Sequence, residues 1–224
     1  MTESAPLEIA TPGGPVSGLL LRPATASLLY VLAHGAGAGM RHPFLESVAQ
    51  ELAVRGIATL RYQFPYMERG QNRTDPPAVA EGTVRAAVEA ARAQAPALPL
   101  IAGGKSFGGR MTSQAQAKAP LPGVRGLAFL GFPLHAPGKP SESRAQHLAD
   151  VAIPMLFLQG TRDPLADLTL MRRVTDGLGP HATLHVVEGG DHSFKVLKRL
   201  GKNDWQVLNE LAVFIAKWAF ELSV

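Results

Sequence analysis

The clearest indication of the fold comes from residues 98–111, which read Leu-Pro-Leu-Ile-Ala-Gly-Gly-Lys-Ser-Phe-Gly-Gly-Arg-Met. A short apolar run meets a glycine-rich corner with Ser106 in its middle, and a helix-compatible segment, 110–118, follows at once. Residues 104–108 fit the pattern G-x-S-x-G, which places a serine at the apex of a tight strand-to-helix turn. Glycines suit this corner because bulky side chains would clash where the strand and the helix meet. The stretch therefore predicts an exposed serine nucleophile.

The composition limits the possible number of domains and the possible chemistry of the protein. The 224-residue chain is 46% hydrophobic, which is enough for one substantial core, and we expect a single domain over residues 1–224. Cysteine is absent, which excludes disulfides, thiolate metal sites and cysteine nucleophiles and fits a reducing compartment. The start of the chain has no signal-peptide pattern, and no apolar run approaches the ~18 residues of a membrane span. We expect a cytoplasmic monomer or homodimer with no membrane partner.

The charge pattern does not indicate a nucleic-acid partner. The formal net charge is +4, with arginines spread along the chain, and only 6% of the residues are aromatic. A nucleic-acid-binding surface is typically a basic stripe or a basic patch interleaved with aromatic side chains. We interpret the excess charge as a solvated basic surface and expect no nucleic acid to bind.

Apolar strands alternate with amphipathic helices over most of the chain. The expected strands are 7–11, 16–22, 28–33, 57–62, 98–102, 124–130, 154–158 and 182–187. The expected helices are 43–55, 76–94, 110–118, 165–178 and 205–222, with a short one at 143–148. This order predicts an α/β protein with a doubly wound, mostly parallel sheet and an antiparallel hairpin at its N-terminal edge. Ligands of such sheets bind at the carboxyl ends of the strands.

The loops that follow these strands carry a serine, an acid and a histidine in that order: Ser106, Asp163 and His192. A serine hydroxyl needs a histidine to take its proton and an acid to orient and stabilise that histidine. Each residue also has a structural interpretation: Ser106 and Asp163 as helix caps, and His192 as a loop residue. Asp191 is the alternative acid and His34 the alternative histidine. We expect Ser106, Asp163 and His192 to form a catalytic triad.

Residues 34–39 read His-Gly-Ala-Gly-Ala-Gly directly after a strand. They are either a flexible turn or part of an oxyanion hole, whose donors would be the backbone N–H groups of Ala36 and Phe107. We favour the oxyanion hole. The residues expected to contact substrate in a shallow pocket, which Phe107 also borders, are His34, Gly35, Phe64, Tyr66, Phe132 and Leu134.

Several other chemistries are excluded or disfavoured. The P-loop pattern would need glycine where Pro99 stands, the dinucleotide-binding pattern would need glycine at Met40, and no zinc-binding histidine pair with helical spacing is present. We expect no cofactor and no metal. Lys105 is a conceivable base for Ser106, as in a Ser-Lys pair. Neighbouring residues on a strand point to opposite faces, however, so we interpret Lys105 as a structural neighbour of Ser106. Arg69 and Arg73 could favour an acidic substrate, but we prefer to interpret them as side chains of a solvated loop.

Four motifs together carry a family resemblance: HGAGAGM at 34–40, FPYME at 64–68, GGKSFGGR at 103–110 and GDHSF at 190–194. The chain resembles the α/β-hydrolase superfamily over nearly its whole length, and its size resembles the dienelactone-hydrolase branch. It is most similar to a small family of uncharacterised hydrolases that includes testis-expressed protein 30. The resemblance implies an eight-stranded sheet with one antiparallel strand and the same three triad residues. Residues 131–151 are too few to build a large lid, so a minimal cap is expected.

The function expected from these observations is cleavage of a small acyl ester or thioester through an acyl-enzyme on Ser106. Two alternatives stay open. Some members of the resembling family act as scaffolds, so the chain is alternatively a hydrolase-fold interaction module with an idle triad. An acyltransferase would share the acyl-enzyme and differ only in the acceptor.

Overall fold

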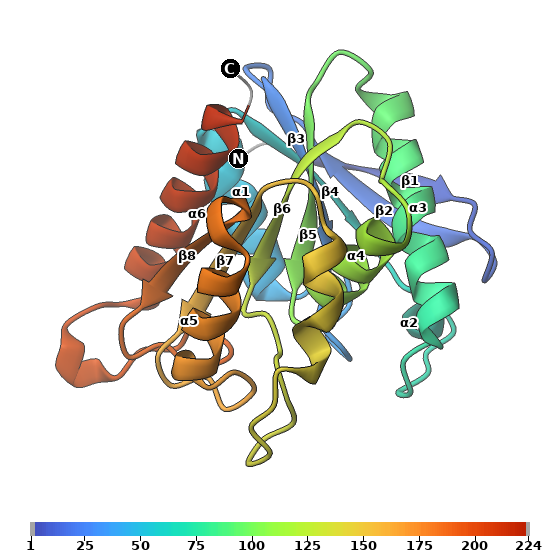
Figure 1. Ribbon diagram of the computed structural model, residues 1–224. Coiled ribbons are helices and arrows are strands. Elements are labelled where there is room, and N and C mark those ends of the chain that lie inside the picture. The colour runs from blue at the N-terminus through green and yellow to red at the C-terminus, as the bar shows by residue number, and fades with distance from the viewer. Residues whose placement is uncertain (1–2, 223–224) are drawn as a thin grey trace.

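The computed structural model describes residues 3–222 as an eight-stranded sheet with helices on both faces (Figure 1). The strands are β1 (Ser4–Ile9), β2 (Val16–Leu21), β3 (Leu28–Ala33), β4 (Ile57–Tyr62), β5 (Leu100–Lys105), β6 (Val124–Leu130), β7 (Met155–Gly160) and β8 (Ala182–Val187). Their order in the sheet is β1-β2-β4-β3-β5-β6-β7-β8. β2 pairs antiparallel with β1 and β4, and the other pairings are parallel. The predicted mostly parallel sheet with an antiparallel N-terminal hairpin is confirmed.

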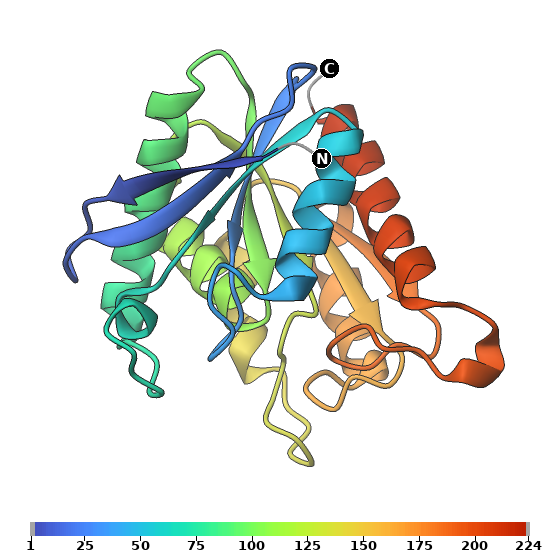
Figure 2. The ribbon, with the colours of Figure 1, turned by 180° about the vertical axis from the view of Figure 1, so that it is seen from behind.

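The helices form two layers. α1 (Pro43–Val54) and α6 (Asp204–Glu221) cover one face, and they lie in front of the sheet in the view from behind (Figure 2). α3 (Pro77–Gln94), α4 (Phe107–Lys118) and α5 (Leu168–Gly177) cover the other face. The short helical segments are α2 (Pro65–Glu68) and the 3₁₀ turns η1 (Ser143–Asp150), η2 (Gly179–His181) and η3 (Lys198–Leu200). Because both layers press on the sheet, every residue of β3 is buried, as its continuous apolar run predicts.

The structure corrects the start of the helix after β7. The sequence pattern placed this helix at 165–178 with Asp163 as a possible cap, but α5 begins at Leu168. Its N-cap is Asp167, whose side chain accepts a hydrogen bond from the Leu170 N–H at 3.1 Å. Asp163 instead opens a tight turn, closed by the Ala166 N–H donating to its carbonyl at 3.2 Å. The turn leaves the Asp163 carboxylate free of a capping role for this helix.

The glycine corner is the tightest point of the sheet. Gly103 and Gly104 both have φ of +142°, a region that residues with a side chain rarely adopt. A Cβ atom on Gly104 would lie 2.2 Å from the carbonyl oxygen of Ala33 in β3. One on Gly103 would lie 1.9 Å from the carbonyl oxygen of Ala128 in β6. The two neighbouring strands therefore leave no room for side chains at the end of β5.

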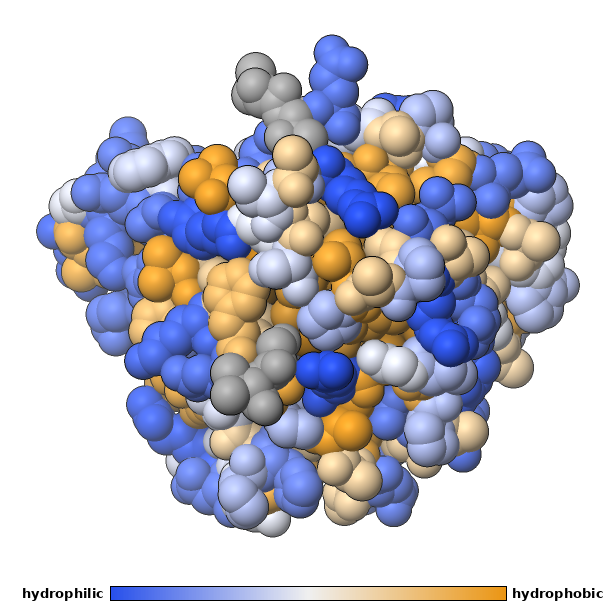
Figure 3. Space-filling view, turned by 90° about the horizontal axis from the view of Figure 1, so that it is seen from above, coloured by the Kyte–Doolittle hydropathy of each residue, from blue (hydrophilic) through white to orange (hydrophobic). Residues whose placement is uncertain are grey.

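The face at the amino ends of the parallel strands lies opposite this corner. Seen from above, hydrophilic residues dominate its rim, and hydrophobic residues show between them nearer the middle (Figure 3). Within residues 3–222, no helix is both long enough and apolar enough to cross a membrane.

Replacing Gly104 by alanine tests this packing. We expect Gly104→Ala to lower the free energy of unfolding by at least about 3 kcal/mol, because it combines a strained φ with a steric clash against backbone. Urea unfolding followed by circular dichroism measures the change. Gly177→Ala is the matched control, since apart from the adjoining residues and backbone of its own helix nothing lies within 4 Å of the position a Cβ would take there. An equal loss in both variants would contradict the packing argument.

Candidate active site

Ser106 stands at the apex between β5 and α4 in a strained conformation. Its φ is +49° and its ψ is −114°, and it is one of two non-glycine residues with positive φ among residues 3–222. The strain is held from both sides: the Ser106 N–H donates to the Leu130 carbonyl at 3.2 Å, and its own carbonyl accepts from the Arg110 N–H at 3.0 Å. This conformation is the one that the G-x-S-x-G pattern predicts for an exposed serine.

A chain of hydrogen bonds runs from Ser106 to a buried acid. His192 Nε2 lies 2.9 Å from Ser106 Oγ, and His192 Nδ1 lies 2.7 Å from Asp163 Oδ2. The Asp163 side chain is fully buried, whereas that of His192 is 21% exposed. Because the carboxylate accepts from Nδ1–H, Nε2 is left with a lone pair facing the serine hydroxyl. The structure thus brings the three predicted residues together in the order needed to move a proton from Ser106.

Two further donors satisfy the Asp163 carboxylate. Gln159 Nε2 donates to Oδ2 at 2.6 Å, and the Leu165 N–H donates to Oδ1 at 2.8 Å. A buried carboxylate without such donors would be costly to keep ionised. Gln159 is not among the residues that the sequence predicts for the site, and β7 continues past the expected strand end at Leu158 to Gly160.

The turns that carry the acid and the histidine are packed directly against each other. A side chain at Gly160 would place its Cβ 2.2 Å from the carbonyl oxygen of Gly190. The Arg162 N–H donates to that same carbonyl at 2.8 Å, and the Gly189 N–H donates to Thr161 Oγ1 at 2.8 Å. These contacts, two between backbone atoms and one through the Thr161 hydroxyl, hold the two turns together independently of the Asp163 and His192 side chains.

Lys105 ties the glycine corner to the histidine loop. Its Nζ donates to the backbone carbonyl of His192 at 2.5 Å and lies 5.5 Å from the centre of the Phe194 ring. A methyl group at Gly131 would lie 2.9 Å from this Nζ and 3.5 Å from both Asp163 Oδ2 and His192 Cε1. Burial lowers the pKa of Lys105 from its ordinary 10.5 to about 8, against the opposing charges of Asp163 and Asp191. Among residues 3–222, no hydrogen bond joins it to Ser106, which agrees with its interpretation as a structural neighbour.

The loop after β3 is held against the serine by His34 and Tyr66. His34 Nδ1–H donates to the Gly35 carbonyl at 2.7 Å, and Nε2 accepts from the Phe64 N–H at 3.2 Å. Burial lowers the pKa of His34 to about 4, so the ring is neutral, as these two bonds require. The Tyr66 hydroxyl accepts from the Gly37 N–H at 2.9 Å. His34 therefore positions the loop and is fully buried, and it does not face the pocket as expected for a substrate contact.

Ala36 lines the cavity over Ser106, and Phe107 directly follows Ser106 in the chain. Phe107 is the first residue of α4, where a helix N–H has no partner within the helix. No hydrogen bond of the Ala36 or Phe107 N–H is found within the described part of the chain. A Cβ on Gly35 would lie 3.7 Å from Ser106 Cβ, so the loop reaches the serine.

A cavity of about 340 Å³ opens over Ser106 and His192. Its remaining walls are formed by Gly35, Ala36, Ala38, His42, Phe44, Leu45, Lys105, Leu165 and Ser193. The expectation of an aromatic wall is wrong: Phe64, Tyr66, Phe132 and Leu134 are fully buried in the core. They follow strands as expected, but their side chains turn inward and pack against the helices of that face.

The two arginines weighed for an acidic substrate do not line this cavity. Arg69 forms an ion pair with Asp75 at 2.8 Å, and Arg73 is exposed. Their position agrees with the preferred interpretation as a solvated loop.

The chain matches a known protein family over most of its length. Residues 26–220 match the family described as an alpha/beta hydrolase domain. The chain belongs to the α/β-hydrolase family. The likeness to the smaller family that includes testis-expressed protein 30 remains a prediction.

Solved structures share the fold at low sequence identity. A serine hydrolase without a lid from Xanthomonas campestris is 23% identical, with a TM-score of 0.72 and coverage of 97% of this chain and 96% of that one. A dienelactone hydrolase from Anabaena variabilis is 19% identical, with a TM-score of 0.79 and coverage of 98% of each chain. A cold-adapted esterase from an Arctic intertidal metagenomic library is 19% identical, with a TM-score of 0.70, covering 96% of this chain and 93% of that one. The predicted α/β-hydrolase fold of the dienelactone-hydrolase type is confirmed.

The buried ammonium of Lys105 predicts a specific pH dependence of stability. Between pH 8 and 10.5 the unfolded chain holds a proton at this residue that the folded chain has released, so the group makes stability rise with pH. We expect the stability of the wild type relative to Lys105→Met to increase across this window in urea unfolding experiments. Lys118→Met, which removes a surface lysine paired with Glu81, is the control. Parallel curves for the wild type and Lys105→Met would contradict the prediction.

Proposed function

We propose that the protein is a serine hydrolase that cleaves a small acyl ester or thioester through an acyl-enzyme on Ser106. The observation that carries the proposal is the hydrogen-bonded chain from Ser106 through His192 to the buried Asp163, with the serine on a strained strand-to-helix turn. Such a chain is the arrangement that activates a serine hydroxyl at neutral pH. Membership of the α/β-hydrolase family supports it.

The proposed reaction proceeds in two halves. Ser106 Oγ bonds to the acyl carbon while its proton passes to His192 Nε2, and Asp163 stabilises the charged imidazole. The Ala36 and Phe107 N–H groups donate to the oxyanion, and the start of α4 adds its positive dipole there. The bond to the leaving alcohol or thiol then breaks as His192 returns the proton to it. Water repeats the sequence on the acyl-enzyme, which releases the acid and restores the serine.

The cavity supports a small, apolar acyl group. Its volume is about 340 Å³, and Ala36, Ala38, Leu45 and Leu165 line it. Lys105 also lines it, but its ammonium group is bonded to the His192 carbonyl. No long insertion closes over it, since the segment between β6 and β7 holds a loop and the single 3₁₀ turn η1. The lidless serine hydrolase and the esterase that share the fold fit this substrate class.

Covalent labelling tests the nucleophile. We expect a fluorophosphonate probe to label the wild type and leave Ser106→Ala unlabelled, because only an activated serine reacts quickly with such a probe. Ser113→Ala is the control, since Ser113 also contacts a histidine, His147, at 2.8 Å but lies outside the cavity. An unlabelled wild type would favour an interaction module over a hydrolase.

Exchange of the acid tests its role. We expect Asp163→Asn to lower kcat for a p-nitrophenyl ester roughly 10³- to 10⁴-fold, because an amide favours the wrong histidine tautomer. Asp191→Asn is the matched control, because it removes the charge of the residue next to His192. Asp191 Oδ1 accepts from the Ser193 and Lys195 N–H groups, and asparagine keeps an oxygen that can accept these bonds. A comparable loss in both variants would assign the effect to charge or loop stability.

A further inference from the structure

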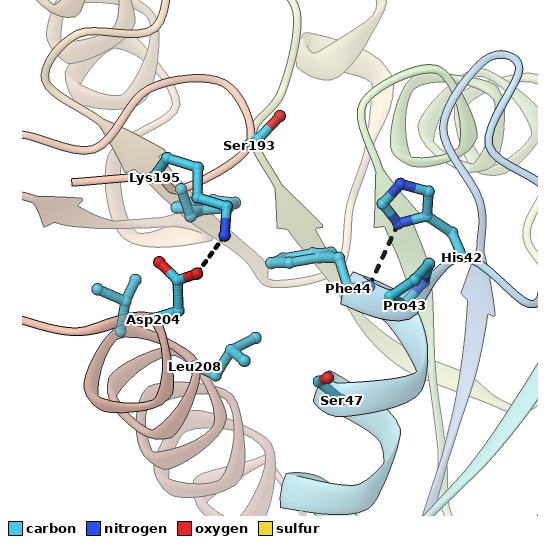
Figure 4. A pocket seen from close by; sticks show the side chains of 10 residues that line it. His42, Pro43, Phe44, Ser47, Ser193, Lys195, Asp204 and Leu208 are labelled. Atoms are coloured by element: carbon cyan, nitrogen blue, oxygen red, sulfur yellow. Dashed lines mark hydrogen bonds and ion pairs between the residues drawn. The ribbon is translucent and has the colours of Figure 1, made fainter.

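A second hollow, the α1–α6 groove, is shown in Figure 4, and it shares lining residues with the active-site cavity. Its volume is about 320 Å³. It lies between the beginnings of α1 and α6, and the loop after His192 closes one side. Phe44 and Ser47 enter it from α1, and Leu208 enters it from α6. The groove is therefore built from segments that are distant in sequence.

The groove and the active-site cavity share walls. His42, Phe44 and Ser193 line both. Ser193 directly follows His192 in the chain, so the shared wall stands next to the proposed general base. The two hollows are therefore adjacent, and a molecule whose reacting bond lies at Ser106 would reach the groove by passing Phe44.

The chemistry of the groove suits an uncharged, apolar group. The Phe44 ring stacks on the Phe194 ring, with centres 5.8 Å apart and an interplanar angle of 8°. Val207 and Leu208 add aliphatic surface. The charges at the rim, Lys195 and Asp204, are paired with each other. Because Lys195 and Asp204 neutralise each other, neither of them favours the binding of a charged ligand.

The position of the histidine decides which half of a substrate enters the groove. His192 Nε2 must deliver its proton to the leaving oxygen or sulfur, so the leaving group lies on the histidine side of Ser106. The groove opens on that side, along Ser193, whereas Ala36 and Leu165 line only the active-site cavity. We propose that the α1–α6 groove binds the leaving group of the substrate, an uncharged aliphatic or aryl alcohol or thiol. This inference rests on the proposed hydrolase function.

Filling the groove tests the assignment. Ser47→Trp places an indole in the groove, and Val54→Trp places the same side chain on the far end of α1, where Val54 is 81% exposed. The esters are hexyl butyrate, ethyl butyrate and ethyl hexanoate, which lengthen the alcohol or the acyl side separately. We expect Ser47→Trp to lower the ratio of kcat/KM for hexyl butyrate over ethyl butyrate about tenfold, because several methylene groups lose their burial. Val54→Trp should leave the ratio unchanged.

Two outcomes would overturn the assignment: an unchanged ratio in Ser47→Trp, or a loss confined to ethyl hexanoate, which would place the acyl chain in the groove. Binding separates this proposal from the hydrolase function. In the Ser106→Ala background, which cannot form the acyl-enzyme, Ser47→Trp should weaken binding of hexyl butyrate about tenfold by calorimetry. Absence of turnover with every ester would reject the function, while unchanged binding in this background would reject the groove.

Discussion

The site depends on the absence of side chains at the corner between β5 and α4. Gly103 and Gly104 let β3 and β6 close on the end of β5 at distances that no Cβ atom tolerates. The chain can then turn sharply enough to hold Ser106 at a positive φ and to start a helix at the next residue. One packing constraint thus places the serine at the turn and puts the Phe107 N–H, the first of the helix, directly after it.

The partners of the serine are fixed by backbone contacts in the same way. The close approach of Gly160 to Gly190 joins the turn of the acid to the turn of the histidine. Lys105 then connects the histidine loop back to β5 through the His192 carbonyl. These contacts therefore hold the three strand ends together independently of the hydrogen bonds among Ser106, His192 and Asp163. They keep the distances along the proton path short without a lid.

The fold and the hydrogen-bonded chain could be predicted from the sequence because strand-end positions and glycine patterns are local features. Side-chain direction is not local: Phe64 and Phe132 follow strands yet turn into the core. His42 lines the cavity from the start of a helix, a position that a search of strand ends does not cover. A glutamine after a strand carries no catalytic signal of its own, and the role of Gln159 shows only in its bond to Asp163. The bond from Lys105 to the His192 carbonyl spans 87 residues. Such contacts arise only when distant segments meet.

The central claim is that Ser106 carries the acyl group during turnover. The most direct measurement mixes the protein rapidly with p-nitrophenyl butyrate, quenches with acid at successive times and maps the modified peptides by mass spectrometry. We expect an early release of p-nitrophenol and a butyryl group on Ser106 in the peptide that contains it. A butyryl group on Lys105 or a histidine, or steady turnover in Ser106→Ala, would contradict it.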